Sequence, residues 1–544
     1  MISESKRRDL GPAWLVAGSS AWMATLANIP LWRELAALSL LDQPAGWLLA
    51  VALAVVMGAL LVALLSLLAW RCTLKPAILL LLVASAFAAY FMLTYRIVID
   101  STMLENVLQT DRREALALFS PRLLAALFLL AVVPGWLVWR TTVHYRPWPH
   151  QLLRNTIAIA VAIAAAAGVV LLSFQPLSSA MRNHKQLRYM LNPLASVYAL
   201  GQAVAKPLRR GPGRMEPLGR DATLAWQGAH APLLVLVLGE TGRAGNFALN
   251  GYARATTPEL AAQNVVSWRN AWSCGTSTAA SVPCMFSHLG RQAYEDRKAD
   301  AENLMDVLQH AGLAVLWIDN QAGCKGVCDR VPSAKVAESR HPTLCPDGEC
   351  LDGILLEGID QRIAALPAER RARGVVLVLH QMGSHGPAYA RRSPAAFKRF
   401  LPECTSVNLQ DCSRAEVVNA YDNTIAYTDH VLASTVEWLK RRQADYDTAM
   451  VYVADHGESL GENNLYLHGL PYSLAPDVQK HVPWITWLSP GFERDAGTGM
   501  QCLRARADRQ VSHDNYFHSV LGLLRVRTAA YRPELDAYAG CAPG

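Results

Sequence analysis

The sequence predicts a protein in two parts: an N-terminal transmembrane domain of five helices, then an α/β domain with a mostly parallel central sheet. Hydrophobic residues make up 52% of the 544 residues and charged residues only 17%, whereas an average soluble chain carries about 25% charged residues. Long apolar segments without charges are concentrated before residue 175. Beyond it, short runs rich in Val and Leu alternate with polar helical stretches, which is typical of an α/β fold.

The transmembrane domain is predicted from five apolar runs, each close to the roughly 17–25 residues that cross a bilayer. Charges occur only at the edges of these runs, and several runs end in Trp or Tyr, as at membrane interfaces. The runs are Ala13–Trp32, Trp47–Trp70, Ala77–Tyr95, Leu123–Trp139 and Ile157–Phe174. We therefore expect five spanning helices within residues 1–174, with buried core helices as the alternative.

The orientation is predicted from Lys and Arg in the loops between these runs. An N-terminus in the cytoplasm places more of these cations on the cytoplasmic side than on the opposite side, which is the usual bias. An odd number of spans then puts everything after Phe174 outside the cytoplasm.

The cysteines support that orientation. The chain has 11 cysteines, of which only Cys72 precedes residue 175, at the expected cytoplasmic end of the second span. The remaining even set fits an oxidising compartment, where disulfides form. Pairing between sequence neighbours is the simplest arrangement, but the sequence alone does not fix the connectivity. Structural zinc at the closest cysteines is the alternative, and those cysteines lack the usual C-x2-C spacing.

A bridge is predicted between the two parts, at residues 175–229, which are polar, basic and punctuated by Pro and Gly. Its Met181–Leu191 segment is expected to be an interfacial amphipathic helix. The net charge of +7 is not gathered in one patch, so nucleic acid is not an expected partner. The second domain is then expected at residues 230–544.

The α/β domain is predicted from short apolar runs of the kind that form strands buried on both faces. They are Leu233–Leu238, Leu313–Ile318, Val375–Leu379, Met450–Val453 and Trp484–Leu488. Polar residues of metal-binding type follow the first four runs. Because open α/β sheets bind ligands beyond the carboxyl ends of their strands, we expect a functional site at that edge.

The residues at this edge suit a metal ion. Glu240 follows the first run, and Asp455 and His456 follow the fourth. Two carboxylates and an imidazole favour Zn²⁺ or Mn²⁺ over a redox thiolate site. His385 and His468 are further candidates, with a structural hydrogen bond as the alternative role for either.

A nucleophile is expected in Ser273–Cys284, a segment dense in hydroxyl groups and bracketed by Cys274 and Cys284. A helix is expected to begin inside it, so a phosphate or alkoxide there would meet the positive helix end. A metal-coordinated hydroxyl can attack phosphorus at neutral pH. Helix N-capping is the alternative role, and composition does not select one hydroxyl.

These segments resemble the lipid A phosphoethanolamine transferase family, which includes the mobile colistin-resistance enzymes and belongs to the alkaline phosphatase/sulfatase superfamily. The resemblance covers nearly the whole chain: five spans, a bridge and a domain of alkaline phosphatase/sulfatase type. The motifs that carry it are Gly239–Arg243 with Asn250–Tyr252, Cys274–Ala279 with Ser281–Ser287, Gly323–Gly326, Gly383–Pro387 and Asp455–Asn463.

The resemblance implies roles for single residues. Thr278 matches the family nucleophile. The positions that match zinc ligands are Glu240, Thr278, Asp455 and His456. The positions that match substrate-binding residues are Asn106, Thr110, Lys325, His385 and His468, the last two also matching a second zinc site. Gln321 holds the place of a family Asn, and Asn320 lies one position earlier, which leaves that polar contact open.

The family's disulfides are implied as well. The pairs are Cys274–Cys284, Cys324–Cys328, Cys345–Cys350 and Cys404–Cys412, with Cys502–Cys541 remaining.

The implied reaction has two steps. Zinc-bound Thr278 attacks phosphatidylethanolamine, diacylglycerol leaves, and a lipid A phosphate attacks the phosphothreonine-type intermediate. The product would lower the negative charge of the outer membrane and confer polymyxin resistance. The expected protein is a monomer in the bacterial inner membrane with its catalytic domain in the periplasm.

Two alternatives remain open from the sequence. The same chemistry could use another acceptor, such as Kdo, heptose, a protein or a glycan, or could transfer phosphoglycerol. A non-catalytic lipid-binding protein is disfavoured, because every expected ligand position is filled.

Overall fold

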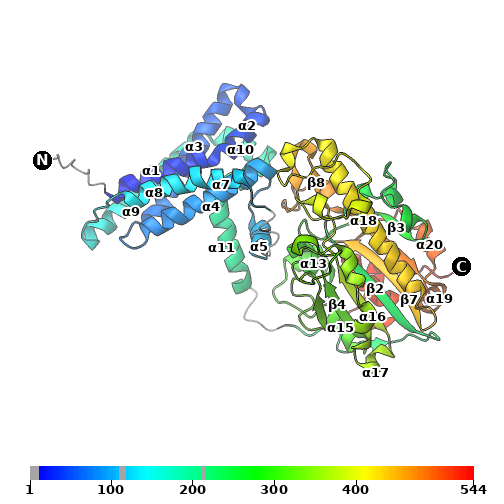
Figure 1. The fold of residues 1–544 in the computed structure, drawn as a ribbon. Helices are drawn as coiled ribbons and strands as arrows, with labels where there is room; N and C mark the ends of the chain where they lie inside the picture. Colours follow the sequence, from blue (N-terminus) through cyan, green and yellow to red (C-terminus); the bar gives the residue numbers. More distant parts are fainter. Residues whose placement is uncertain (1–10, 110–114, 116–117, 210–214, 544) are drawn as a thin grey trace. The chain divides into compact units, whose positions relative to one another are not determined.

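The computed structural model describes residues 11–109, 115, 118–209 and 215–543. The chain divides into two compact units, Met1–Leu104 with Phe119–Ala203 and Glu105–Leu118 with Val204–Gly544. The described part of the first unit is built from helices, and the second contains the sheets (Figure 1).

Four helices of the described residues are long and apolar enough to cross a membrane. They are α3 (Pro44–Leu67), α4 (Leu74–Tyr95), the segment Pro121–Arg140 and α9 (Trp148–Leu172). The third consists of α7 (Pro121–Leu127), a π-helical turn (Phe128–Val132) and α8 (Val133–Arg140). Pro134 follows the turn and has no N–H to donate, so the helix is irregular there.

The first expected span is divided rather than continuous. It forms α1 (Pro12–Thr25), a 3-10 turn (Leu26–Asn28) and α2 (Ile29–Ala37). Pro30 disfavours a continuous helix at this point, and Asn28 Nδ2 donates to the Met23 carbonyl oxygen at 2.7 Å. The membrane domain therefore has four long apolar helices and a shorter one.

The chain stays helical after α9. It forms α10 (Phe174–Asn183), a 3-10 helix (Lys185–Met190) and α11 (Leu194–Arg209). The expected interfacial helix over Met181–Leu191 is thus divided between the end of α10 and the 3-10 helix. The side chain of Asn192 is buried and donates to the carbonyl oxygens of Ala27 and Ser85, which ties this segment to the membrane helices.

The second unit is organised by a sheet that has eight strands among the described residues, in the order β11-β3-β10-β7-β2-β6-β4-β5. Their bounds are β2 (Ala231–Gly239), β3 (Val266–Trp272), β4 (Ala314–Asp319), β5 (Ser333–Lys335), β6 (Val375–His380), β7 (Tyr446–Ala454), β10 (His481–Leu488) and β11 (Val511–Ser512). β10 is antiparallel to both neighbours, and the other pairings are parallel. The predicted mostly parallel sheet is confirmed, and each predicted run lies in one of its strands except for Leu313, which directly precedes β4.

Helices and two small two-stranded sheets surround this sheet (Figure 1). The helices are α12 (Pro258–Ala261), α13 (Thr278–Met285), α14 (Arg291–Glu295), α15 (Leu304–His310), α16 (Ile359–Ala364), α17 (Ala368–Arg371), α18 (Arg414–Lys440), α19 (Pro490–Ala496), α20 (Met500–Ala505) and α21 (His513–Leu523). β1 (Thr223–Leu224) pairs with β12 (Val526–Arg527), and β8 (Ser459–Leu460) pairs with β9 (Tyr466–Leu467). The longest helix, α18, begins with a capping box between Ser413 and Glu416.

The described residues contain five disulfides, which are the pairs expected from the resemblance. They are Cys274–Cys284, Cys324–Cys328, Cys345–Cys350, Cys404–Cys412 and Cys502–Cys541. The exposed Cys72 is the free cysteine of the described chain. Since Cys324 and Cys328 are bonded to each other, they do not form the alternative zinc site.

Candidate active site and metal centre

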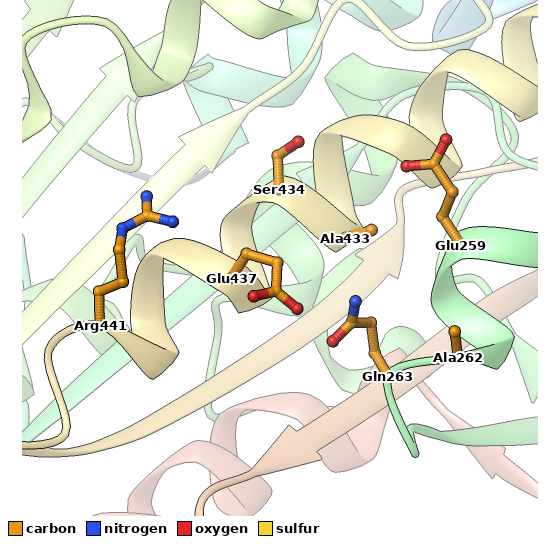
Figure 2. A pocket seen from close by; sticks show the side chains of 7 residues that line it. All are labelled: Glu259, Ala262, Gln263, Ala433, Ser434, Glu437 and Arg441. Atoms are coloured by element: carbon orange, nitrogen blue, oxygen red, sulfur yellow. The ribbon is translucent and has the colours of Figure 1, made fainter.

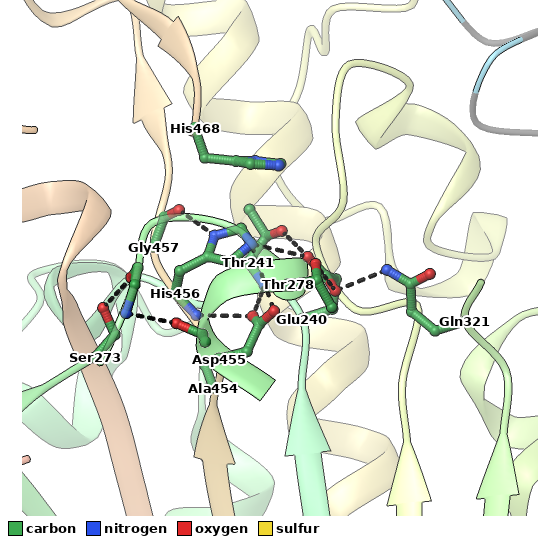
Figure 3. A network of polar contacts seen from close by, with 12 residues as sticks. Glu240, Thr241, Ser273, Thr278, Gln321, Ala454, Asp455, His456, Gly457 and His468 are labelled. Atoms are coloured by element: carbon green, nitrogen blue, oxygen red, sulfur yellow. Dashed lines mark hydrogen bonds and ion pairs between the residues drawn. The ribbon is translucent and has the colours of Figure 1, made fainter. Parts of the chain in front are cut away.

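Glu240, Asp455 and His456 lie together at the carboxyl edge of the sheet (Figure 3). β2 and β7 are adjacent parallel strands, with Gly239 paired to Ala454, so the residues that follow them emerge side by side. One possible ligand atom from each residue lies within 4.8 Å of the others, and all three side chains are buried. The structure therefore brings together the metal-binding residues predicted from the first and fourth runs.

Two atoms of this cluster point to a cation. Among the described residues, Asp455 Oδ2 and His456 Nε2 are buried and form no hydrogen bond, although the two atoms lie 3.4 Å apart. Leaving buried polar atoms without partners is costly. A divalent cation bound by two carboxylates and an imidazole would satisfy both atoms, and this donor set suits Zn²⁺.

The electrostatics of the cluster support the same interpretation. Burial, together with the nearby charge of Glu240, raises the pKa of Asp455 to about 7, which favours its neutral form. Burial also disfavours ionisation of Glu240, but the neighbouring His456 ring, whose Nε2 lies 3.3 Å from Glu240 Oε1, holds the pKa of Glu240 well below its ordinary value. Two carboxylates in contact repel each other, and a bound cation would remove that repulsion.

Thr278 contacts the cluster directly. It is the first residue of α13, it is buried, and its hydroxyl donates to Glu240 Oε2 at 3.0 Å. The hydroxyls of Ser273 and Thr276 donate to backbone carbonyl oxygens instead, and that of Ser281 accepts from a backbone N–H. Among the hydroxyls of this segment whose partners are described, Thr278 is thus the one aimed at the acidic cluster.

The side chains of Asn320 and Gln321 make different contacts. Gln321 Nε2 donates to Glu240 Oε2 at 2.7 Å, the oxygen that also accepts from Thr278 (Figure 3). Asn320 Nδ2 donates instead to the Cys350 carbonyl oxygen and to a carboxylate oxygen of Asp352. The polar side chain that reaches the site from this loop is therefore Gln321.

The two predicted histidines lie beside the cluster. The ring centroid of His468 is 4.2 Å from that of His456 and 5.4 Å from that of His385. His468 Nδ1 lies 3.3 Å from Glu458 Oε1, so a buried carboxylate orients this ring.

The loop that carries His385 rests on the backbone of Glu240. The N–H of Ser384 donates to the Glu240 carbonyl oxygen at 3.0 Å. Gly383 has a φ of +53°, and a Cβ at this position would come within 2.5 Å of the same oxygen. Glycine is required here because the chain adopts a left-handed conformation in close contact with its neighbour.

Comparison with known proteins identifies the family. Residues 57–208 match the family "Phosphoethanolamine transferase EptA/EptB", and residues 232–526 match the family "Sulfatase". Phosphoethanolamine transferase EptA of Salmonella typhimurium is 40% identical over 476 residues, which cover 85% of this chain and 84% of that protein. Phosphatidylethanolamine transferase Mcr-1 of Escherichia coli is 36% identical over 532 residues, which cover 96% of each.

A solved structure agrees over the full length. It is lipooligosaccharide phosphoethanolamine transferase A (EptA), an integral membrane protein from Neisseria meningitidis, with a TM-score of 0.92 and 36% identity over 98% of this chain and 100% of that chain. The chain belongs to the EptA/Mcr family of phosphoethanolamine transferases. It is accordingly an integral membrane protein with a periplasmic catalytic domain of the sulfatase fold.

The remaining predicted residues of this EptA/Mcr-type transferase lie in two other segments. Lys325 has a φ of +52°, and its amine donates to the Ala322 carbonyl oxygen at 3.4 Å, in the loop that also carries Gln321. Asn106 lies on α5 (Ser101–Gln109). Thr110 lies outside the described residues.

A hollow of about 380 Å³ lies apart from the predicted site residues, between α12 and α18 (Figure 2). Its lining residues are Glu259, Ala262, Gln263, Ala433, Ser434, Glu437 and Arg441. Since it contains none of the side chains that contact Glu240, it takes no part in the transferase site.

Proposed function

We propose that this protein transfers phosphoethanolamine from phosphatidylethanolamine to a phosphate of lipid A, through a covalent intermediate on Thr278. The observation that carries the proposal is the hydrogen bond from the Thr278 hydroxyl to Glu240, within a buried cluster of metal-binding side chains. The name of the relative Mcr-1 supports the donor lipid. The apolar helices support lipid substrates, because they keep the enzyme in the membrane that holds them.

The proposal includes one Zn²⁺ held by Glu240, Thr278, Asp455 and His456. The unpartnered buried atoms of Asp455 and His456 support this assignment. When bound, a zinc ion supplies Lewis acidity that lowers the pKa of a hydroxyl and stabilises charge on phosphoryl oxygens.

The first step is attack on the donor. Glu240 Oε2 accepts the hydroxyl proton of Thr278 in a hydrogen bond and so orients Oγ1. A bond forms between Thr278 Oγ1 and phosphorus, the bond to the diacylglycerol oxygen breaks, and diacylglycerol leaves as the protonated alcohol. Since Thr278 is the first residue of α13, the positive end of the helix favours the negative charge on the phosphoryl group.

The second step regenerates the enzyme. An oxygen of the lipid A phosphate attacks phosphorus, the bond between phosphorus and Thr278 Oγ1 breaks, and Oγ1 takes up the proton that the attacking phosphate releases. We assign His385 and His468 to binding the substrate phosphate, because the His468 ring lies beside His456 and the His385 ring lies beside His468. Lys325 is assigned to a phosphate contact, and Asn106 with Thr110 to the lipid head group, on the family match alone.

The domains follow the same proposal. Residues 1–174 anchor the enzyme with the N-terminus in the cytoplasm, residues 175–229 form the bridge, and residues 230–544 carry out catalysis. The membrane is the bacterial inner membrane, whose outer leaflet would present both lipids to the site.

The test is a pair of hydroxyl deletions. Thr278→Ala should abolish the addition of phosphoethanolamine to lipid A, measured by mass spectrometry of lipid A from cells that express each variant. Thr276→Ala is the matched control, since its hydroxyl bonds to the Leu470 carbonyl oxygen and not to the cluster. An active Thr278→Ala variant, or modification of core sugars instead of lipid A, would contradict the proposal.

The metal is tested separately by elemental analysis. Purified protein should hold about one zinc per chain, and removal of the metal by a chelator should abolish transfer. Full transfer after complete removal of zinc would contradict the proposed metal site.

A further inference from the structure

His513 connects two segments of the active site that are far apart in the sequence. The backbone N–H of Cys274 donates to His513 Nδ1 at 3.0 Å, and His513 Nε2 lies 3.0 Å from the Ala454 carbonyl oxygen. Cys274 begins the disulfide-closed segment that carries Thr278. Ala454 directly precedes Asp455 and His456.

These partners determine which nitrogen of the His513 ring carries the hydrogen. A backbone N–H can only donate, so Nδ1 must be the unprotonated acceptor, and a carbonyl oxygen can only accept, so Nε2 must carry the hydrogen. The residue is 1% exposed. Burial, assisted by the charge of His456, lowers the pKa of His513 to about 3, so the ring is neutral.

The fold explains how one ring reaches both segments. β11 is parallel to β3 and pairs Ser512 with Trp272, so His513 and Ser273 leave neighbouring strands at the same edge. In the sheet, β3 and β10 separate β11 from β7, which ends at Ala454. The ring of His513, as the first residue of α21, therefore bridges the space between the nucleophile segment and the end of β7.

We propose that His513 is a positioning residue for phosphoryl transfer. By bonding to Cys274 and Ala454 at once, it fixes the separation between the segment that carries Thr278 and the residues Asp455 and His456. The inference rests on the proposed function of Thr278 and deepens it. His513 bonds only to backbone in this arrangement, so it acts through the two segments and not on the substrate.

Three substitutions test the hydrogen bonds of His513 to Cys274 and to Ala454 one at a time and together. His513→Asn leaves an amide oxygen near the place of Nδ1 and keeps the acceptor for Cys274. His513→Gln leaves an amide N–H near the place of Nε2 and keeps the donor to Ala454. His513→Phe keeps a ring of similar size and removes both bonds.

We expect His513→Phe to lower kcat for transfer from a fluorescent phosphatidylethanolamine by roughly 100-fold, because displacing a reacting group by about 1 Å has an effect of this size. KM should change little, and zinc content should stay at the wild-type level, because every proposed ligand remains. The Asn and Gln variants should each restore part of kcat.

The matched control is His518→Phe. His518 lies on the same helix, is buried, and accepts a hydrogen bond from the backbone N–H of Arg532. Its replacement should lower the melting temperature without a comparable loss of kcat. Amide hydrogen exchange at Cys274 should accelerate in His513→Phe and not in His518→Phe.

The results distinguish this inference from the proposed function. If Thr278→Ala is inactive while His513→Phe keeps the wild-type kcat, His513 is not a positioning residue and the proposed function stands. If Thr278→Ala is active, the proposed function fails. If His513→Phe does not fold, a wild-type kcat in both the Asn and Gln variants would overturn the inference.

Discussion

Replacing Gln321 with Ala should slow transfer by about 10- to 100-fold without loss of the metal. Its amide donates to Glu240 Oε2 at 2.7 Å, in a buried site. A hydrogen bond to a charged group contributes about 1.5–3 kcal/mol, and each 1.36 kcal/mol of transition-state stabilisation changes a rate about tenfold. Since Thr278 donates to the same oxygen, loss of the amide would allow Glu240 to turn and displace Thr278, the proposed nucleophile.

The Asn variant is the more informative one. Asn is shorter than Gln by one methylene, about 1.5 Å, so the donor would lie about 4 Å from Glu240 Oε2. That distance exceeds the 2.7–3.2 Å of an N–H···O hydrogen bond. We therefore expect Gln321→Asn to be nearly as slow as Gln321→Ala.

The assay measures kcat and KM for transfer from a fluorescent phosphatidylethanolamine, together with zinc content. Gln292→Ala is the matched control, because the Gln292 amide donates to Asp296 Oδ2 at 2.8 Å on the exposed surface. Loss of the same bond in water should leave kcat unchanged. A Gln321→Ala variant with wild-type kcat and wild-type zinc content would refute the reasoning.

Three further predictions concern stability and the frame of the site. Removing the Cys502–Cys541 disulfide by a double Ala substitution should cost about 4 kcal/mol in denaturant unfolding, because 39 residues separate the cysteines; an unchanged midpoint contradicts this. Asp352→Asn should accelerate amide exchange at residues 382 and 383, whose N–H groups both donate to this carboxylate at 2.8 Å. Unchanged exchange would show that other contacts hold that loop. The third prediction concerns the pH dependence of stability. The pKa of His513 is about 3 in the folded protein and 6.5 in the unfolded chain, so below pH 6.5 the unfolded chain binds a proton that the folded protein does not bind. The contribution of neutral His513 to the free energy of unfolding is therefore complete above pH 6.5 and declines toward pH 3. The difference in free energy of unfolding between wild type and His513→Phe should decrease by about 2 kcal/mol between pH 7 and pH 5. A pH-independent difference would count against this.

The strands that carry the site were predictable because each is buried on both faces. β2 and β6 contain continuous Val and Leu runs, β7 contains the apolar run Met450–Val453, and the structure shows nearly every side chain in these strands buried. The parallel order of β2 and β7 then brings Glu240 next to Asp455. The edge of the sheet that carries the candidate metal centre thus follows from residue patterns, whereas the adjacency of β2 and β7 comes from the structure.

Other elements left no such pattern. β11 has only two residues, and β3 contains Arg269 and Asn270, so neither forms an apolar run. The first apolar run was expected to be a continuous span, but Pro30 and the bonded side chain of Asn28 divide it. A hydropathy profile reflects only the apolar composition of a segment. It does not show where a proline or a side-chain hydrogen bond interrupts the backbone hydrogen bonds of a helix.

The choice between Asn320 and Gln321 required coordinates for a related reason. Either amide suits a polar contact, and the decision lies in where neighbouring loops place carboxylates. Asp352 accepts from Asn320 and turns it away from the cluster, which leaves Gln321 to meet Glu240.

The residues that orient this site differ in kind from those that carry its chemistry. Glu240 and His456 could be recognised because few residue types bind a metal. His513 and Asp352 bond mainly to backbone N–H and carbonyl groups. Every segment has such groups, so no sequence motif identifies these two residues. A catalytic site tolerates displacements of only about 0.5 Å. Side chains that fix the backbone should therefore affect kcat almost as strongly as those that touch the phosphoryl group, while leaving the metal in place.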